Sequence, residues 1–198
     1  FADCLDFNNV LTTNSLYLDY HTNPIYQKNN GFSYIVGNPP YVRIQKLGKA
    51  YKVNLNTITK LDFTGNIDLY IYFFFLNNSL LADNGQMAYV TPNTFLSADM
   101  AKILRDRLAM DKVVSKIYNF KEIPVFDSVS FTAAVSILNK LSENDRATFI
   151  LGKTGESFAK PFLNLRNTPA WEVLDDENTK IVRAVEGQLY SLNDYFDL

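Results

Sequence analysis

The sequence predicts an α/β protein whose sheet is doubly wound and ends in an antiparallel hairpin. Its apolar segments read in the order strand, helix, strand, helix, strand, strand. Helices connect the parallel strands of a doubly wound sheet, whereas two successive strands joined by a short loop pair antiparallel. The expected strands are 32–37, 86–91, 113–120 and 131–138, with candidate strands at 16–20 and 147–151; the expected helices are 68–81 and 98–108.

The helix expected at 68–81 contains the apolar run 69–76. Asp68 or Asn66 is a candidate N-cap, and the sequence Asp83-Asn84-Gly85 is typical of a helix stop. The run is far shorter than the roughly 20 apolar residues of a membrane span, so it is interpreted as a buried helix.

The stretch 43–66 is interpreted as a solvated loop with one helical turn. Four lysines in it could neutralise DNA phosphates, which is the alternative interpretation: Lys46, Lys49, Lys52 and Lys60.

Composition indicates a globular, cytoplasmic protein. The 198 residues are 47% hydrophobic and 20% charged, enough for one full-sized core. The net charge of −2 gives no overall basic field, so any DNA contact must come from a local patch or from other parts of a longer protein. The single Cys4 excludes an intramolecular disulfide framework, and no metal cluster is predicted. Because the chain starts at Phe1 and shows no signal peptide, it is interpreted as an excised fragment.

The most informative segment is Asn38-Pro39-Pro40-Tyr41, directly after the strand 32–37. Both prolines have a fixed φ and no N–H, so the strand must end in a stiff, extended loop. The loop leaves the Asn38 amide and neighbouring carbonyls at the carboxyl end of the strand, where open α/β sheets bind ligands. Fixed acceptors at this position suit an amine that attacks an electrophile.

This segment resembles that of the amino-group methyltransferases that use S-adenosylmethionine, above all the adenine-specific DNA methyltransferases associated with type IIG restriction-modification enzymes. The resemblance implies that the Asn38 side-chain oxygen and the Pro39 carbonyl accept hydrogen bonds from the exocyclic amine of a flipped adenine. It also implies that Tyr41 stacks on this base. The segment 126–135 resembles the loop and strand that offer a second aromatic ring, which would be Phe126, with Phe131 as the rival.

The cofactor-binding residues implied by the resemblance lie at the start of the chain. The sequence Ala2-Asp3-Cys4-Leu5-Asp6-Phe7 resembles the segment whose carboxylate binds the adenine amine of S-adenosylmethionine, which assigns that role to Asp3, with the Cys4 backbone beside it. The glycine-rich cofactor loop of the family is absent, so we expect the N-terminal strands of this Rossmann-like methyltransferase sheet to be missing.

Two segments are predicted on this basis: a partial catalytic domain at 1–150, and a linker at 151–198 with a helix near 176–186. The linker would lead toward an absent DNA specificity domain. The longer protein would then methylate adenine in double-stranded DNA and could carry a fused endonuclease, whereas the isolated fragment would be inactive. An incomplete sheet exposes a strand edge, which favours self-association.

Three alternatives stay open from the sequence. A protein-glutamine methyltransferase uses a similar loop to hold a side-chain amide, and an RNA adenine or guanine methyltransferase would use the same chemistry. From a different class, the chain could be a non-catalytic module that binds DNA or a partner.

Overall fold

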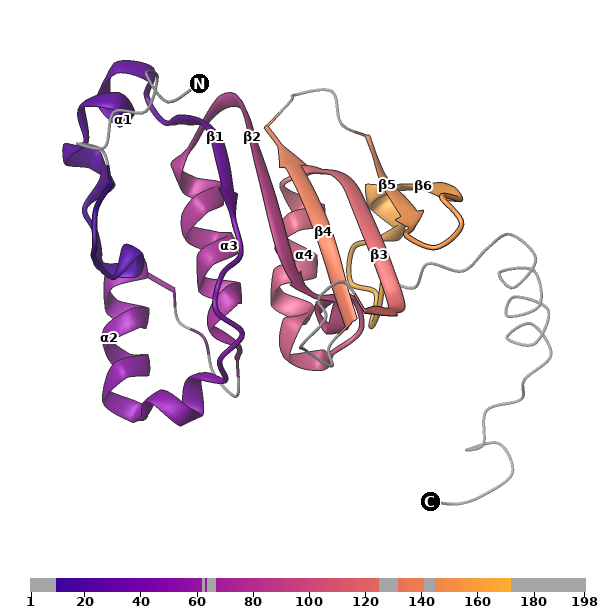
Figure 1. Ribbon diagram of the computed structural model, residues 1–198, viewed down its shortest axis with the longest axis horizontal. Helices are drawn as coiled ribbons and strands as arrows, with labels where there is room; N and C mark the ends of the chain where they lie inside the picture. The colour runs from indigo at the N-terminus through magenta and orange to yellow at the C-terminus, as the bar shows by residue number, and fades with distance from the viewer. Residues whose placement is uncertain (1–9, 62, 64–66, 125–131, 141–144, 172–198) are drawn as a thin grey trace.

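The computed structural model describes residues 10–61, 63, 67–124, 132–140 and 145–171, and in this part of the chain the α/β class is confirmed. Six strands form one sheet in the order β1-β2-β4-β3-β5-β6 (Figure 1). The strands are β1 (Phe32–Gly37), β2 (Leu81–Pro92), β3 (Val114–Pro124), β4 (Thr132–Asn139), β5 (Arg146–Leu151) and β6 (Ser157–Pro161). The α-helices are α1 (Pro24–Asn29), α2 (Lys49–Thr59), α3 (Leu69–Leu80) and α4 (Lys102–Met110).

The strand pairing combines parallel and antiparallel neighbours. β1 runs parallel to β2, and β2 runs antiparallel to β4. β3 and β4 are antiparallel neighbours, which confirms the predicted hairpin. β5 is the strand expected at 147–151; it pairs parallel with β3, and the unpredicted β6 pairs with its other side.

The register brings several strand ends to one edge of the sheet. Gly37, the last residue of β1, lies opposite Tyr89, and Pro92, the last residue of β2, lies opposite Ala133 near the start of β4. We call this the carboxyl edge. Asn38 directly follows β1 and Asn93 directly follows β2, so both lie at this edge.

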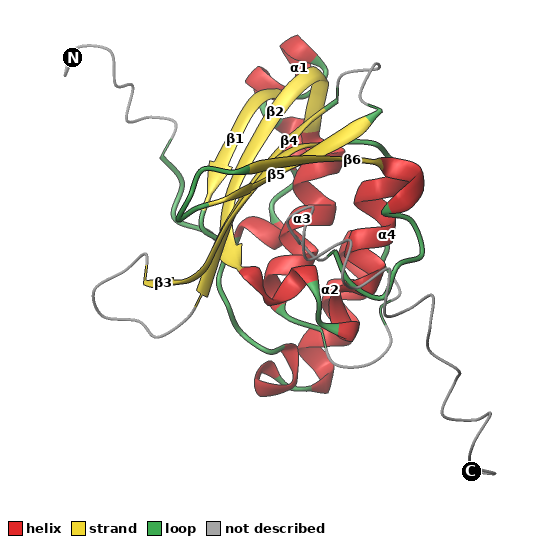
Figure 2. Cartoon of the chain, turned by 90° about the vertical axis from the view of Figure 1, so that its right-hand side faces the viewer, coloured by secondary structure: helices red, strands yellow, loops and turns green. Residues whose placement is uncertain are grey.

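Helices α2, α3 and α4 lie on one side of the sheet (Figure 2). α3 is apolar on all sides, as expected for a helix that is buried between a sheet and other helices. Tyr70, Tyr72 and Phe74 are fully buried, and the Phe74 ring centre lies 5.2 Å from that of Tyr89 in β2. This packing fixes the position of α3. The first turn of α3 lies next to the loop that carries Asn38.

Strand β1 lies at the end of the sheet. In the part of the chain that the structure describes, β1 pairs with β2 alone, and its Tyr34 and Val36 side chains are 75% and 82% exposed. Large apolar side chains at an unpaired edge are typical of a surface that another element covers.

Three sequence-based expectations about secondary structure are wrong. No strand forms at 16–20; short 3₁₀ turns occupy Ser15–Tyr17 and Tyr20–Thr22 because the Asn14 and Asp19 side chains accept hydrogen bonds from their first-turn amides. The expected loop at 43–66 contains the helix α2, whose Leu55 is fully buried.

The expected helix stop at residues 83–85 is the third error. α3 ends at Leu80 and β2 begins at the next residue, so Asp83, Asn84 and Gly85 lie inside the strand. They form an irregularity there: the register with β1 shifts between Phe32 and Tyr34, and Asn84 adopts a left-handed conformation with φ 64°.

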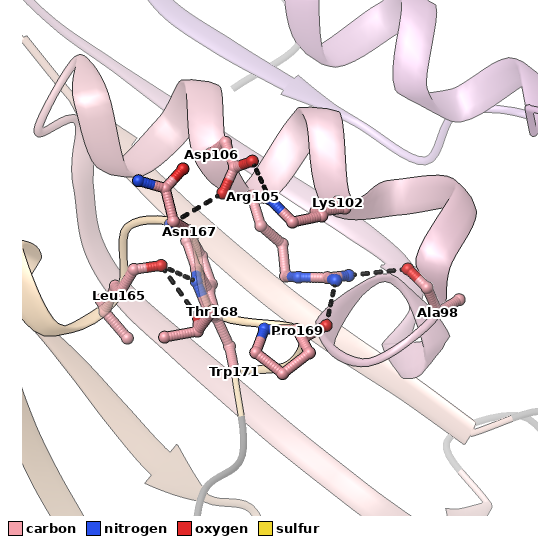
Figure 3. Close-up of polar contacts among 9 residues, drawn as sticks. All are labelled: Ala98, Lys102, Arg105, Asp106, Leu165, Asn167, Thr168, Pro169 and Trp171. Carbon is pink, nitrogen blue, oxygen red and sulfur yellow. Dashed lines mark hydrogen bonds and ion pairs between the residues drawn. The ribbon is translucent and has the colours of Figure 1, made fainter. Parts of the chain in front are cut away.

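A buried arginine connects the last described residues to the loop after β2 (Figure 3). Arg105 of α4 is fully buried, and its Nη1 donates to the carbonyls of Phe95 and Ala98 at 2.8 Å each. Its Nη2 donates to the carbonyl of Pro169. Trp171 continues this connection, since its backbone N–H donates to the carbonyl of Leu96 at 2.7 Å. The segment after β6 is thereby held against the end of β2.

Candidate active site

Asn38 lies where the sequence predicts it, at the carboxyl end of β1. The strand ends at Gly37, Asn38 is exposed, Pro39 is buried and Pro40 is exposed. The bonds before both prolines are trans. The buried Pro39 ring anchors the loop, while the Asn38 side chain stays accessible to solvent.

The loop is also fixed on its far side. The Leu69 amide donates to the Val42 carbonyl at 2.8 Å, and the Ile44 amide donates to the Ile67 carbonyl at 3.1 Å. Ile44 itself is buried. Residues 38–41 are therefore held between the end of β1 and the first turn of α3, which makes a rigid platform of the kind that positions reacting groups.

The Tyr41 hydroxyl lies between two acceptors. It is within hydrogen-bonding distance of the Asn38 Oδ1, and it lies 3.0 Å from the Val90 carbonyl oxygen in β2. A phenol has a single O–H hydrogen, so it donates to one of these acceptors at a time. Tyr41 is half-buried, and this burial raises the pKa of its hydroxyl.

Asp68 occupies the N-cap position of α3, as predicted, although its side chain does not hydrogen-bond to the first turn of the helix. Burial raises the pKa of its carboxyl, while the nearby Arg43 guanidinium acts in the opposite direction. Arg43 and Asp68 also form a backbone bridge, which adds to the fixation of the loop.

A cavity of about 330 Å³ adjoins the platform. This volume is at the lower end of the range for small-molecule sites. Its lining combines the end of β1 and the following loop with side chains from α3, β2 and the N-terminal turns: Ser15, Tyr20, Ile35, Val36, Gly37, Asn38, Pro39, Pro40, Phe73, Asn77 and Tyr89. Gly37 has close neighbours there, because a Cβ at this position would lie 3.1 Å from the Tyr89 ring.

The structure brings together Asn38, Pro39 and Tyr41 of the predicted site. The other predicted site residues, Asp3, Cys4 and Phe126, lie outside the described residues.

Asn93 is a further polar residue at the carboxyl edge. No role was assigned to it from the sequence. Its amide Nδ2 donates to Asn119 Oδ1 at 3.1 Å, and its Oδ1 accepts from the Thr132 hydroxyl at 2.5 Å. The one sequence signal was its place directly after a strand, since side chains that follow parallel strands gather at the ligand-binding edge.

Comparison with known proteins identifies the family of this chain. The Eco57I restriction-modification methylase family matches residues 4–126, which is well over half of the chain. The chain belongs to this family. The matched range begins at Cys4, includes the platform at 38–41 and ends at Phe126.

Two relatives illustrate the extent of the match. The type II restriction enzyme and methyltransferase RM.Eco57I from Escherichia coli is 28% identical over 123 residues, which is 61% of this chain and 12% of the relative. The type II methyltransferase M.AccI from Acinetobacter calcoaceticus is 31% identical over 147 residues, which is 73% of this chain and 26% of the relative. The chain therefore spans about a quarter or less of the length of these two family members.

Solved structures show the same fold in restriction-modification enzymes. The type IIL restriction-modification enzyme MmeI, solved in complex with DNA, matches with a TM-score of 0.59 and 17% identity, over 76% of this chain and 21% of MmeI. The type IIG restriction endonuclease BpuSI matches with a TM-score of 0.56 and 17% identity, over 79% of this chain and 22% of BpuSI.

In the ranges that the structure describes, no helix is both long and apolar enough to cross a membrane. The same ranges contain no group of three or more His, Cys, Asp or Glu side chains arranged to hold a metal ion.

Proposed function

We propose that these residues form the second half of the catalytic domain of a DNA methyltransferase that transfers a methyl group from S-adenosylmethionine to the exocyclic amine of adenine. The observation that carries the proposal is the position of Asn38: an exposed amide on a rigid Asn-Pro-Pro-Tyr platform, at the carboxyl edge and beside a cavity. Membership in a restriction-modification methylase family supports the reaction class. The proposal concerns a longer protein that also supplies the first half of the sheet.

Asn38 and Pro39 would activate the amine. The lone pair of an exocyclic adenine amine is delocalised into the ring, which makes the nitrogen a poor nucleophile. Hydrogen bonds from its two N–H groups to the Asn38 Oδ1 and the Pro39 carbonyl would favour a tetrahedral nitrogen with a localised lone pair. These acceptors are preorganised dipoles that stabilise positive charge as it develops on the nitrogen. The nitrogen would take the methyl group from the sulfonium, whose carbon–sulfur bond would break to leave a neutral thioether, and the methylated, cationic nitrogen would then release one proton to water.

The position of the Tyr41 hydroxyl leaves the Asn38 Oδ1 available to the target amine. Its hydroxyl has a second acceptor in the Val90 carbonyl at 3.0 Å, so it can leave the Asn38 Oδ1 without losing a hydrogen bond. The Asn38 Oδ1 also has two lone pairs, so it can accept from the amine while Tyr41 still contacts it. The Tyr41 ring would stack on one face of the flipped base, and Phe126 would contact the other face or an edge.

The described residues fit part of an S-adenosylmethionine site. The aromatic side chains of Tyr20 and Phe73 line the cavity beside Asn38. The backbone at Gly37 also lines it and packs closely against the Tyr89 ring. When bound, the cofactor supplies an electrophilic methyl group on a sulfonium. We propose that Asp3 and the Cys4 backbone bind its adenine, with the remaining contacts coming from the first half of the sheet.

Double-stranded DNA is the proposed partner. A base inside a duplex is out of reach of such a platform, so the target adenine must be flipped out of the helix. The DNA complex of MmeI supports DNA as the substrate class. The net charge of −2 gives this chain no overall attraction for DNA, so we assign sequence recognition to a specificity domain elsewhere in the longer protein.

Substitutions at Tyr41 test the base-stacking role. Tyr41→Ala should weaken capture of the target base by about 1–3 kcal/mol, because the stacking contact is lost. Tyr41→Phe keeps the ring and should retain transfer within about fivefold, since one hydrogen bond contributes only about 1 kcal/mol. The measurement is kcat/KM for DNA together with the Kd for S-adenosylmethionine, which should stay within twofold. Equal losses in both variants would show that the hydroxyl rather than the ring carries the function.

The substrate class is tested by offering DNA, RNA and protein together. The full-length enzyme is incubated with methyl-labelled S-adenosylmethionine, unmethylated plasmid DNA, total RNA and a protein extract, and the label is counted in each fraction. Label in DNA supports the proposal. Label confined to RNA or protein would overturn DNA as the substrate, and no label in any fraction would favour a non-catalytic binding module.

A further inference from the structure

We propose that Asn93 is a positioning residue of the methyl-transfer site, which fixes the end of β2 against the interior of β3 and the start of β4, beside the proposed position of the target base. The inference rests on the proposed function, because it assigns to Asn93 an effect on the capture of that base. It adds a residue outside the Asn-Pro-Pro-Tyr platform.

The Asn93 side chain forms a bridge across three strands. Asn93 follows the last residue of β2, donates to Asn119 of β3 at 3.1 Å and accepts from Thr132, the first residue of β4, at 2.5 Å. An amide is suited to this role because one side chain supplies a donor and an acceptor at opposite sides. Neither an alanine nor a carboxylate could make both contacts.

The Asn119 end of the bridge is buried and lies at a strand irregularity. Asn119 is 9% exposed, and its Oδ1 also accepts from the Lys121 amide at 3.0 Å. Lys121 has a left-handed backbone with φ 48°, and the pairing of β3 with β4 shifts between Asn119 and Pro124. A left-handed lysine needs support from its surroundings, which this shared acceptor provides.

The bridge and the contact that holds Tyr41 share one short stretch of chain at the end of β2. Val90, whose carbonyl accepts from Tyr41, lies three residues before Asn93. Asn93 therefore fixes the interior of β3 and the start of β4, while the adjacent end of β2 holds Tyr41. An error in strand-end position of about 1 Å is enough to impair a reaction that requires close alignment.

The test uses the full-length enzyme with DNA in which 2-aminopurine replaces the target adenine, so that fluorescence reports base flipping. Asn93→Ala should lower kcat/KM for DNA 10- to 100-fold and reduce the fluorescence of the enzyme–DNA complex. Its Kd for S-adenosylmethionine should stay within twofold, because the bridge does not contact the proposed cofactor cavity.

Thr132 supplies a matched pair of variants that does not depend on how Asn93→Ala folds. Thr132→Ser keeps the hydroxyl donor and should retain kcat/KM within threefold, whereas Thr132→Val has the same shape without the donor and should lose about tenfold. In the double variant Asn93→Ala/Thr132→Val the loss should be no larger than in Asn93→Ala, since both changes break the same contact.

The inference would be overturned if Asn93→Ala and Thr132→Val kept full turnover and full 2-aminopurine fluorescence. It would equally be overturned if both lost cofactor and DNA binding in proportion to a lower Tm, since that result describes a purely structural role. Both of these outcomes would leave the proposed function standing, provided that the wild-type enzyme forms methyladenine. An unmodified enzyme that forms no methyladenine would overturn the proposed function, and this inference with it.

Discussion

Replacing Asn38 with alanine is expected to lower methyl transfer by at least about 100-fold, which is the usual loss when one preorganised polar group that stabilises a transition state is removed. The variant loses the side-chain oxygen that would accept from the target amine, while the Pro39 carbonyl stays. Asn38 is exposed, so its removal should change the free energy of unfolding by no more than about 0.5 kcal/mol. Tyr41 keeps the Val90 carbonyl as an acceptor. The Kd for S-adenosylmethionine should therefore be unchanged, and the loss should appear in kcat.

A matched control is Asn164→Ala, which removes an exposed asparagine from the turn after β6, at the opposite end of the sheet order from β1. This variant should keep full activity. If Asn38→Ala retained more than about half of the transfer rate, Asn38 would not be the acceptor for the amine, and the mechanism would be wrong.

Replacing Arg105 with methionine is expected to produce the largest loss of stability, about 3 kcal/mol. The guanidinium is fully buried and donates to three backbone carbonyls, from Phe95, Ala98 and Pro169. Methionine fills a similar volume but leaves these acceptors unpaired, and each buried unpaired group costs about 1–3 kcal/mol. Removal of the buried charge offsets part of this cost, since burial disfavours the charged form and lowers the pKa of Arg105. The free energy of unfolding is measured by chemical denaturation.

Arg107→Met is the control on the same helix. Its side chain is about half exposed and pairs with Asp111 at i,i+4, so its loss should cost less than about 1 kcal/mol. Limited proteolysis provides a second measurement: Arg105→Met should expose the segment after β6 to cleavage, because the contact with Pro169 is lost. Equal stabilities of the Arg105→Met and Arg107→Met variants would contradict the assigned role of Arg105.

The sequence was most informative where local chemistry alone determines the structure. Two successive prolines force an extended loop in any context, so the platform after β1 could be predicted with its side chains. The helix α3 and the hairpin β3–β4 follow from continuous apolar segments and a short connection. The assignment of Asn38, Pro39 and Tyr41 to one site depended instead on the resemblance of this loop to that of the amino-group methyltransferases.

Features that depend on distant residues could not be predicted in this way. β6 forms because it can pair with the open edge of β5. The helix α2 forms because its Leu55 side chain packs into the hydrophobic core. The burial of Arg105 depends on its partners Phe95 and Pro169, which are 10 and 64 residues away in sequence. The contact of Asn93 with Thr132 spans 39 residues. Such contacts follow from the topology of the sheet, which a local pattern does not specify.

The central claim is that the Asn38 platform methylates the amine of adenine in DNA. The most direct test is transfer of a labelled methyl group by the full-length enzyme to unmethylated plasmid DNA, followed by digestion to nucleosides and separation of the products. The account predicts label in N6-methyladenine and its loss with Asn38→Ala. Label in a methylcytosine, or N6-methyladenine formed equally well by the Asn38→Ala variant, would contradict it.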